Sequence, residues 1–504
     1  MGKYDFLKSG TDVRGVAVEY EGKPIDLTDE AVYDISAAFV AFLIKKTGKR
    51  AEEIKISVGH DSRISADRIS AAVLKSLKNC GVNALYFDLA STPAMFMSTI
   101  ELALDGAIEI TASHHPFFRN GLKFFTQGGG AEGSDISEIL NIADKKAFDD
   151  TKSGRVERYD FMPRYAEMLR DIIKSGVNAE DYELPLKGKK IIVDAGNGVG
   201  GFYASEVLSP LGADITGSQF LEPDGMFPNH IPNPENAEAM ESICKATVEN
   251  KADLGIIFDT DVDRGGAVDE KGNELNKNNL LAIAAEIAAD GKTGCTIVTD
   301  SVTSDGLKEF IEEDLKCTHH RFVRGYKNVI NEALRLEKEG KNAVLAGETS
   351  GHIAFKENYF LDDGAYLITR IVIKMVQLSR EGKTLSGVIE NMPQPEETAE
   401  LRMNIGLADF KDYGNAVIKS VEDYCAENPS WIMADDSREG VRVSFKDKEA
   451  DGWFVLRLSV HDPVLPLNIE SNVKGGVKVI ANRLYERLKS FTELDFKDFT
   501  KYIG

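Results

Sequence analysis

The residues best suited to chemistry in this chain stand in a short polar segment, TASHHP at residues 111–116. The apolar residues 107–110 before it predict a β-strand. A serine just past a strand end is a candidate nucleophile or phosphate carrier, and adjacent histidines can move protons. The alternative is an ordinary polar loop. The segment alone does not decide between the two.

A second segment offers metal ligands. Asp259, Asp261 and Asp263 alternate directly after the apolar residues 254–258. Three carboxylates at this spacing place hard oxygen atoms around one point, as Mg²⁺ or Ca²⁺ requires. Arg264 follows them and suits a phosphate oxygen, although it could equally pair with one of the aspartates. A solvated acidic turn without a metal is the simplest alternative.

An EF-hand is the competing metal interpretation of the same segment. The three aspartates would be its positions 1, 3 and 5, and Glu270 falls at position 12. However, Arg264 stands at position 6, where the sharp turn of an EF-hand needs glycine. Both flanks also predict strands, whereas an EF-hand loop joins two helices. The pattern therefore favours another type of metal loop.

Two further segments carry polar groups suited to a sugar phosphate. Residues 347–352, GETSGH, combine a carboxylate, two hydroxyls and an imidazole, a mixture that a polyol needs. A capped helix start explains them equally well. Residues 457–463, RLSVHDP, combine an arginine, a hydroxyl and a turn that could form an anion-binding nest. Neither segment is specific when taken alone.

The elements expected to position these segments alternate along the chain. Strands are predicted at residues 55–58, 84–87, 190–193, 254–258 and 343–346, with helices such as 65–79 and 278–289 between them. This alternation predicts an α/β fold with mostly parallel strands, whose carboxyl ends form binding sites. A linker is predicted at residues 392–397. The last hundred residues predict a β-hairpin and a closing helix, and therefore a small α+β domain.

Chain length, net charge and cysteine spacing exclude some classes of function. A chain of 504 residues predicts three or four domains. Its net charge of −22 disfavours nucleic acid and acidic membranes as partners, and its longest apolar stretch, residues 35–44, is too short to span a bilayer. The five cysteines form no CxxC pair, which predicts neither a zinc site nor a disulfide framework and favours a cytoplasmic protein.

Taken in order, these segments resemble the motifs of the α-D-phosphohexomutase superfamily, most of all bacterial phosphomannomutase/phosphoglucomutase enzymes. The family's serine loop, Thr-Ala-Ser-His-Asn-Pro, matches residues 111–116 with His115 in place of asparagine. Its Asp-x-Asp-x-Asp-Arg and Gly-Glu-x-Ser-Gly-His motifs match residues 259–264 and 347–352. Residues 12–15 and 120–123 match its Asp-x-Arg-Gly and Asn-Gly-Leu-Lys segments. The resemblance covers nearly the whole chain.

The resemblance implies an architecture of four domains around a central cleft. Three similar mixed α/β domains would carry the phosphoserine, metal-binding and sugar-binding loops, at residues 1–160, 161–277 and 278–395. A smaller C-terminal α+β domain at residues 396–504 would carry the phosphate-binding loop. The small-molecule partners would be hexose phosphates, with no nucleic acid or membrane partner, and the protein would be a monomer or homodimer.

The resemblance also implies an enzyme, an intramolecular phosphotransferase (isomerase) that interconverts hexose 1- and 6-phosphates of mannose or glucose. It would use one Mg²⁺ per chain and a hexose 1,6-bisphosphate as intermediate and activator. The implied catalytic residues are Ser113, His114, Lys123, Arg14 and Arg264. The implied metal ligands are Ser113, Asp259, Asp261 and Asp263. The implied substrate-binding residues are Glu348, Ser350, His352, Arg324, Lys327, Arg457, Ser459 and His461.

The chain departs from the family pattern at three places. In the phosphate loop, Val460, His461 and Asp462 replace the usual small, threonine and neighbouring residues. The lysine expected after the strand at residues 296–299 is absent, so Arg324 or Lys327 would have to compensate. His115 replaces the asparagine beside the nucleophile. The alternatives are a phosphoglucosamine mutase, a phosphatase that uses Ser113, or a noncatalytic binding protein for sugar phosphate or Ca²⁺.

Overall fold

The computed structural model of the chain describes residues 2–459 and 462–502. The backbone divides into two compact units. The first comprises Met1–Ile287 with Ser350–Val388, and the second comprises Ala288–Thr349 with Ile389–Gly504. Within the described residues, no helix combines the length and apolar character needed to cross a bilayer.

The first unit begins with a large mixed sheet. Its strands lie in the order β1 (Lys8–Ser9), β2 (Asp12–Val16), β6 (Arg119–Thr126), β5 (Gly106–Ile110), β3 (Lys55–His60), β4 (Asn83–Leu89) and β8 (Arg155–Arg158), and β7 (Gly129–Gly130) pairs with β6. The inner strands β5, β3 and β4 are parallel, and β6 runs antiparallel to β5. The carboxyl end of β5 is therefore central in the sheet, and the predicted serine loop follows it directly.

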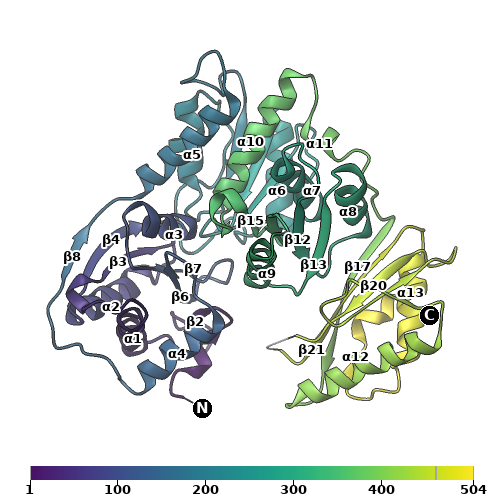
Figure 1. Cartoon of the computed structure of the whole chain (residues 1–504), viewed down its shortest axis with the longest axis horizontal. Helices are drawn as coiled ribbons and strands as arrows, with labels where there is room; N and C mark the ends of the chain where they lie inside the picture. The colour runs from purple at the N-terminus through teal and green to yellow at the C-terminus, as the bar shows by residue number, and fades with distance from the viewer. Residues whose placement is uncertain (1, 460–461, 503–504) are drawn as a thin grey trace. The chain divides into compact units, whose positions relative to one another are not determined.

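Helices cover both faces of this sheet (Figure 1). On one face, helices α1 (Asp29–Thr47), α2 (Ala66–Asn79) and α4 (Gly133–Asp144) share a buried apolar cluster with Ile56 and Val58, which alternate with residues of the other face. On that other face lies α3 (Thr92–Glu101), where Ser98 Oγ is 2.8 Å from Ser57 Oγ. Burial on both faces explains why these strands read as apolar runs.

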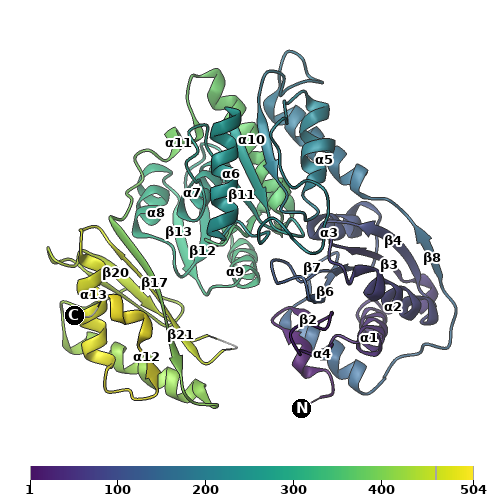
Figure 2. The ribbon, with the colours of Figure 1, turned by 180° about the vertical axis from the view of Figure 1, so that it is seen from behind.

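The rest of the first unit is a second α/β layer. Its sheet holds β9 (Ile191–Asp194), parallel to β10 (Leu254–Phe258), and β11 (Gly265–Val268), antiparallel to β10. Helices α6 (Ala237–Asn250) and α10 (Gly364–Arg380) pack on these strands, and α5 (Met162–Val177) packs against α10 (Figure 2). The hairpin of β15 (Ile353–Phe355) and β16 (Leu361–Asp362) and helix α11 (Leu385–Val388) complete the unit. The tight connection from β10 to β11 is the predicted metal loop.

The second unit holds a parallel sheet and an antiparallel sheet. In the parallel sheet, β12 (Thr296–Asp300) lies between β13 (Thr318–Phe322) and β14 (Ala343–Gly347), with helices α8 (Asp305–Glu309) and α9 (Tyr326–Lys338). Helix α7 (Asn278–Ala289) ends at the start of this unit. The loops after β12, β13 and β14 leave the same edge of the sheet, so their side chains meet there.

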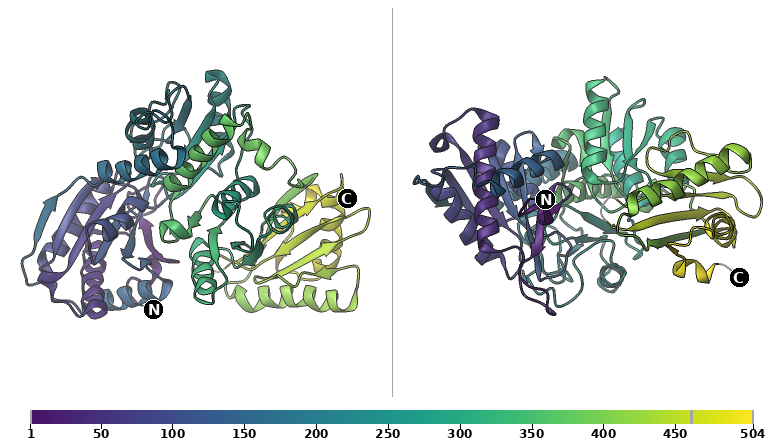
Figure 3. Two further views of the ribbon diagram at one scale, coloured as in Figure 1. Left: turned by 45° about the horizontal axis from the view of Figure 1, so that its top comes forward. Right: turned by 90° about the horizontal axis from the view of Figure 1, so that it is seen from below.

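The C-terminal sheet is larger than the sequence predicted. Its six strands lie in the order β18 (Ile432–Met433), β19 (Val441–Phe445), β20 (Gly452–Leu456), β21 (Val464–Ser471), β17 (Glu397–Ile405) and β22 (Leu494–Asp495). Figure 3 draws this sheet in green to yellow. Helices α12 (Phe410–Glu427) and α13 (Gly476–Leu488) share one apolar core with one face of it. The hairpin β19–β20 and the closing helix were predicted correctly, as was an α+β domain.

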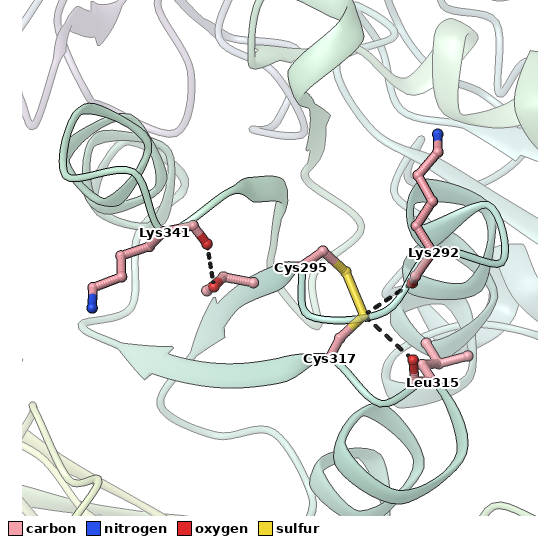
Figure 4. The surroundings of a disulfide bond; sticks show 6 residues. Lys292, Cys295, Leu315, Cys317 and Lys341 are labelled. Carbon is pink, nitrogen blue, oxygen red and sulfur yellow. Dashed lines mark hydrogen bonds between the residues drawn. A yellow bond between two sulfur atoms is a disulfide. The ribbon is translucent and has the colours of Figure 1, made fainter.

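Two cysteines correct the prediction from sequence. A disulfide bond joins Cys295 and Cys317, whose Cα atoms lie 4.9 Å apart (Figure 4). The two residues immediately precede β12 and β13, which pair in parallel from Thr296 and Thr318 onward. The prediction of no disulfide was wrong because sequence spacing does not reveal which parallel strands become neighbours.

This disulfide leads to a stability prediction. It closes a loop of 22 residues, which by loop-closure entropy is worth about 3 kcal/mol. Reduction, or Cys317→Ser, is expected to lower the free energy of unfolding of the second unit by that amount. Both tryptophans, Trp431 and Trp453, belong to this unit, so their fluorescence during urea denaturation measures it.

The matched control is Cys244→Ser, because Cys244 is an unpaired cysteine of the first unit. The urea midpoint of Cys244→Ser, followed by tryptophan fluorescence, should fall on reduction by the same amount as the midpoint of the original protein. If neither reductant nor Cys317→Ser changed the urea midpoint, the bond would not stabilise the unit.

Candidate active site

Ser113 occupies a strained and buried position immediately after β5. Its backbone is left-handed, with φ 52°, and only 1% of the residue is exposed. For a residue with a side chain, this conformation costs on the order of 1 kcal/mol. The Thr111 hydroxyl accepts the Ser113 N–H at 2.9 Å, and Thr111 in turn donates to Asp61 at 2.7 Å. The surrounding loop thus holds the serine in one orientation.

Arg63 holds the backbone of this loop through hydrogen bonds. The residue is 2% exposed, and its Nε donates to Asp61 Oδ2 at 3.0 Å. It also donates to four carbonyl oxygens of the loop, those of Ser113, His115, Pro116 and Arg119. One buried cation therefore satisfies most of the loop's inward-facing carbonyls. Arg63 fixes the backbone on which Ser113 stands.

The three aspartates form a compact buried cluster in the loop between β10 and β11. Ligand oxygens of Asp259, Asp261 and Asp263 lie within 4.8 Å of one another. Val262, between them, has φ 67°, a rare conformation for a β-branched residue. It turns the loop tightly enough to aim alternate carboxylates inward. Ser113 Oγ donates to Asp259 Oδ2 at 3.1 Å, so the serine and metal loops meet.

This cluster suits a divalent cation. Asp261 Oδ1 and Asp263 Oδ1 are buried and have no hydrogen-bond partner among the described residues. Burial, together with the charges of Asp263 and Asp261, raises the pKa of Asp259 well above its ordinary value. Free buried carboxylate oxygens that repel one another form the environment that a hard cation stabilises. The residues present therefore fit Mg²⁺.

Lys123, on β6, reaches the same cluster. Its Nζ donates to Asp261 Oδ2 at 2.8 Å and to Asp263 Oδ2 at 2.5 Å. Burial alone would raise the pKa of Asp263, but Lys123 and neighbouring cations lower it below its ordinary value. An ammonium group thus lies beside the metal ligands, within reach of anything bound between them and Ser113.

His114 lies between Ser113 and Arg264. Its Nδ1 accepts a hydrogen bond from Arg264 Nη2 at 2.7 Å and lies 3.3 Å from Ser113 Oγ. Burial, then the Arg264 charge, lowers the pKa of His114 to about 2. Burial and Arg14 likewise lower the pKa of His115 to about 3, and the two rings stack 5.1 Å apart. Both imidazoles are neutral at physiological pH, so His114 orients Arg264 and is a weak base.

Residues after β14 extend the cluster. His352 Nδ1 bonds to Asp362 Oδ2, and ligand atoms of these two residues and Asp263 lie within 4.8 Å of one another. Burial opposes the charged imidazole, but Asp362 raises the pKa of His352 above its ordinary value. Ser350 Oγ is buried without a hydrogen-bond partner in the part of the chain that the structure describes.

The remaining predicted residues gather in the second unit. Glu348 accepts the Gly325 N–H at 2.6 Å, which places it against the loop of Arg324 and Lys327. Arg324 Nε lies 3.7 Å from Asp300 Oδ2. Arg457, 8% exposed, follows β20 and lies 3.6 Å from Glu439. The second unit therefore brings together two arginines and two carboxylates at the ends of β12, β13 and β20.

The phosphate loop itself is only partly described. Ser459 Oγ accepts the Asp462 N–H at 3.2 Å, consistent with a tight turn. His461, predicted to bind substrate, lies with Val460 outside the described residues. Arg14 is placed on β2, where its Nη2 donates to Asp12 at 2.8 Å.

Comparisons with known proteins agree with this geometry. Residues 7–150, 163–272 and 276–395 match the family models "Phosphoglucomutase/phosphomannomutase, alpha/beta/alpha domain" I, II and III, respectively. A phosphoglucomutase of Neisseria gonorrhoeae is 30% identical over 489 residues, which cover 95% of this chain and 96% of that protein. The chain belongs to the phosphoglucomutase/phosphomannomutase family.

Other members of the phosphohexomutase superfamily are similar over the same length. A phosphomannomutase/phosphoglucomutase of Pseudomonas aeruginosa is 27% identical, covering 95% of this chain and 94% of that one. The crystal structure of a phosphoglucomutase/phosphomannomutase family protein of Burkholderia thailandensis superposes with a TM-score of 0.78 at 25% identity, covering 98% of both chains. The predicted superfamily, the fold of three α/β domains plus a C-terminal sheet domain, and the mutase class of enzyme are confirmed.

Three residues that the site uses were absent from the predicted site. Asp61 and Arg63 follow directly after β3, so their place at a strand end is the signal that could have found them. Thr92, at the start of α3, donates to Asp261 Oδ2 at 2.6 Å, and its N–H donates to the Asp261 carbonyl at 2.9 Å. Nothing in the sequence near Thr92 distinguishes it from a helix cap, since the contact depends on how two distant segments meet.

Proposed function

We propose that this phosphohexomutase interconverts the 1- and 6-phosphates of mannose or glucose through a phosphoryl group carried on Ser113 and a hexose 1,6-bisphosphate. The observation that carries the proposal is the contact of Ser113 Oγ with Asp259, at 3.1 Å, inside a buried trio of carboxylates. This contact supports a phosphoserine whose oxygen would share a cation with all three aspartates.

One Mg²⁺ per chain would be held by Asp259, Asp261, Asp263 and an oxygen of phosphorylated Ser113. When bound, it supplies neutralisation of the negative charge that develops on the transferring phosphoryl group. The hexose 1,6-bisphosphate would also act as the activator that loads Ser113. The free carboxylate oxygens of Asp261 and Asp263 support this assignment.

The protein's own groups would carry the proton and orient the phosphoryl group. In the forward transfer, the bond from phosphorus to Ser113 Oγ breaks as a bond to the sugar hydroxyl forms. The Lys123 ammonium would give a proton to the departing Ser113 Oγ and take up the proton of the sugar hydroxyl, and the same exchange would run in reverse when the other phosphate moves back to Ser113. Arg14 and Arg264 would face the phosphoryl oxygens, with His114 orienting Arg264.

The substrate would be held at both ends. The sugar hydroxyls would be bound by Glu348, Ser350 and His352. The distal phosphate would be bound by hydrogen-bond donors, most of them basic: Arg324, Lys327, Arg457, Ser459 and His461. The closeness of Arg324 and Arg457 to Asp300 supports a shared phosphate site.

The chain would form four domains, at residues 1–160, 161–277, 278–395 and 396–504, and the site would exclude water from the phosphoserine. We also propose a cytoplasmic monomer or homodimer. The three unpaired cysteines favour that location, whereas the disulfide weighs against it.

The test is an isomerisation assay. The purified protein is incubated with Mg²⁺, trace hexose 1,6-bisphosphate and glucose, mannose or glucosamine 1-phosphate, and each 6-phosphate is measured. We expect conversion of the glucose or mannose ester. Faster conversion of the glucosamine ester would move the chain to phosphoglucosamine mutases, and release of inorganic phosphate alone would indicate a phosphatase. No conversion of any ester by folded, phosphorylated protein would refute the proposal.

A further inference from the structure

Glu439 occupies an unusual place in the second unit. It lies in the loop between β18 and β19 and precedes Gly440, whose φ is 57°. A Cβ on Gly440 would lie 2.1 Å from the Leu456 carbonyl oxygen, so only glycine lets this loop press against the end of β20. The loop therefore delivers the Glu439 carboxylate to the point where Arg457 begins the phosphate loop.

The Glu439 carboxylate bridges three separate segments. Its Oε2 accepts the Ser301 hydroxyl at 2.6 Å and the Arg324 N–H at 3.0 Å, from the loops after β12 and β13. Its Oε1 lies 3.6 Å from Arg457 Nη1. A hydroxyl, a backbone N–H and a guanidinium are also the donors that a phosphate takes. One carboxylate thus joins the parallel sheet to the C-terminal sheet at a set of anion-binding groups.

The local charges explain why a carboxylate is needed there. Burial lowers the pKa of Arg457, and the negative charge of Glu439 opposes that effect. The positive charge of Arg324 lowers the pKa further, because the two guanidinium groups repel each other. Asp300, 3.7 Å from Arg324, and Glu439, 3.6 Å from Arg457, offset that repulsion. Ser301 stands in the stretch after β12 where a lysine would be expected, and it binds Glu439.

We propose that Glu439 is a positioning residue, which holds Arg457 and the Arg324 main chain together so that both bind the distal phosphate of the substrate. This inference rests on the proposed function, since the phosphate is that of the hexose phosphate. Glu439 itself does not touch the reacting atoms. It keeps two like-charged groups convergent before the phosphate arrives, which reduces the reorganisation that binding requires.

The test compares Glu439→Gln with Glu439→Ala in the full chain. Glutamine keeps an oxygen that accepts from Ser301 and Arg324 but removes the charge facing Arg457. We expect Glu439→Gln to raise KM for the hexose phosphate about tenfold, and Glu439→Ala to raise it more, while melting temperatures stay close to that of the original protein. The exposed Glu449→Gln is the matched control and should leave KM unchanged.

A binding measurement separates this inference from the mutase assignment. Inorganic phosphate is titrated by calorimetry into the original protein, Glu439→Gln and Arg457→Met. The part of the phosphate binding that is lost in Arg457→Met is assigned to the distal site. Glu439→Gln should weaken that fraction about tenfold. Unchanged or tighter phosphate binding by Glu439→Gln would overturn the inference, the latter by showing that Glu439 competes with phosphate. A protein that converts no hexose phosphate but shows the weakened titration would refute only the mutase assignment.

Discussion

Replacing Ser113 with alanine should lower kcat for hexose phosphate isomerisation by at least about three orders of magnitude, because no other group takes over a covalent nucleophile. Ser113 Oγ is the described hydroxyl that donates to Asp259. The serine is buried, and its methyl replacement removes one oxygen without adding volume. The fold should therefore survive, and melting temperature should change little.

Phosphorylation provides an independent readout. After incubation with hexose 1,6-bisphosphate, intact mass should show one added phosphoryl group on the original protein and none on Ser113→Ala. Ser153→Ala, in an exposed loop of the same unit, is the matched control and should retain both activity and the phosphoryl group. Residual activity of Ser113→Ala near the original rate, or a phosphoryl group still present on that variant, would show that another residue carries the phosphate.

Much of this site was predictable because its motifs follow strand ends. Residues 259–264 come directly after an apolar run, and the structure places them between β10 and β11 with all three carboxylates together. The same reasoning located Ser113 after β5. In parallel sheets the carboxyl ends of strands gather at one edge, so a motif placed after a strand is already placed in space.

What the sequence could not predict depends on contacts between segments far apart in the chain. The Cys295–Cys317 disulfide needs the register of β12 and β13. The Glu439 bridge needs a loop of the C-terminal sheet to meet Ser301, 138 residues earlier in the chain. In the C-terminal sheet, β17 and β21 pair although their partner residues are 60 (Asn404 and Val464) to 74 (Glu397 and Ser471) positions apart, and neither local periodicity nor turn residues reveal such a partner.

The role of His114 also changed once its surroundings were known. As a sequence feature it was a candidate for proton transfer beside Ser113. In the structure, burial and Arg264 lower its pKa to about 2, and its Nδ1 accepts from Arg264. A ring with so low a pKa is a poor base at neutral pH. The geometry favours a role in orienting Arg264, which no spacing of residue types could show.

Arg63→Met should be the most damaging substitution outside the predicted site, with two separable effects. It leaves Asp61, which is fully buried, without its cation, and breaking such a pair costs about 3–5 kcal/mol of unfolding free energy. It also leaves four loop carbonyls without their donor. The shift of Ser113 that follows should lower kcat about a hundredfold, since displacements near 1 Å have effects of that size.

The double variant Asp61→Asn/Arg63→Met separates these effects. Removing both charges should restore much of the stability, because no buried charge then stays unpaired, while kcat stays low because the carbonyls of Ser113 and His115 still lack their donor. Urea denaturation and steady-state kinetics measure the two quantities. Arg68→Met is the control, since Arg68 lies partly exposed on the same stretch of chain and pairs with Asp29. If kcat recovered together with stability in the double variant, Arg63 would serve only to neutralise Asp61, and the position of Ser113 would not depend on the hydrogen bonds that Arg63 donates to its loop.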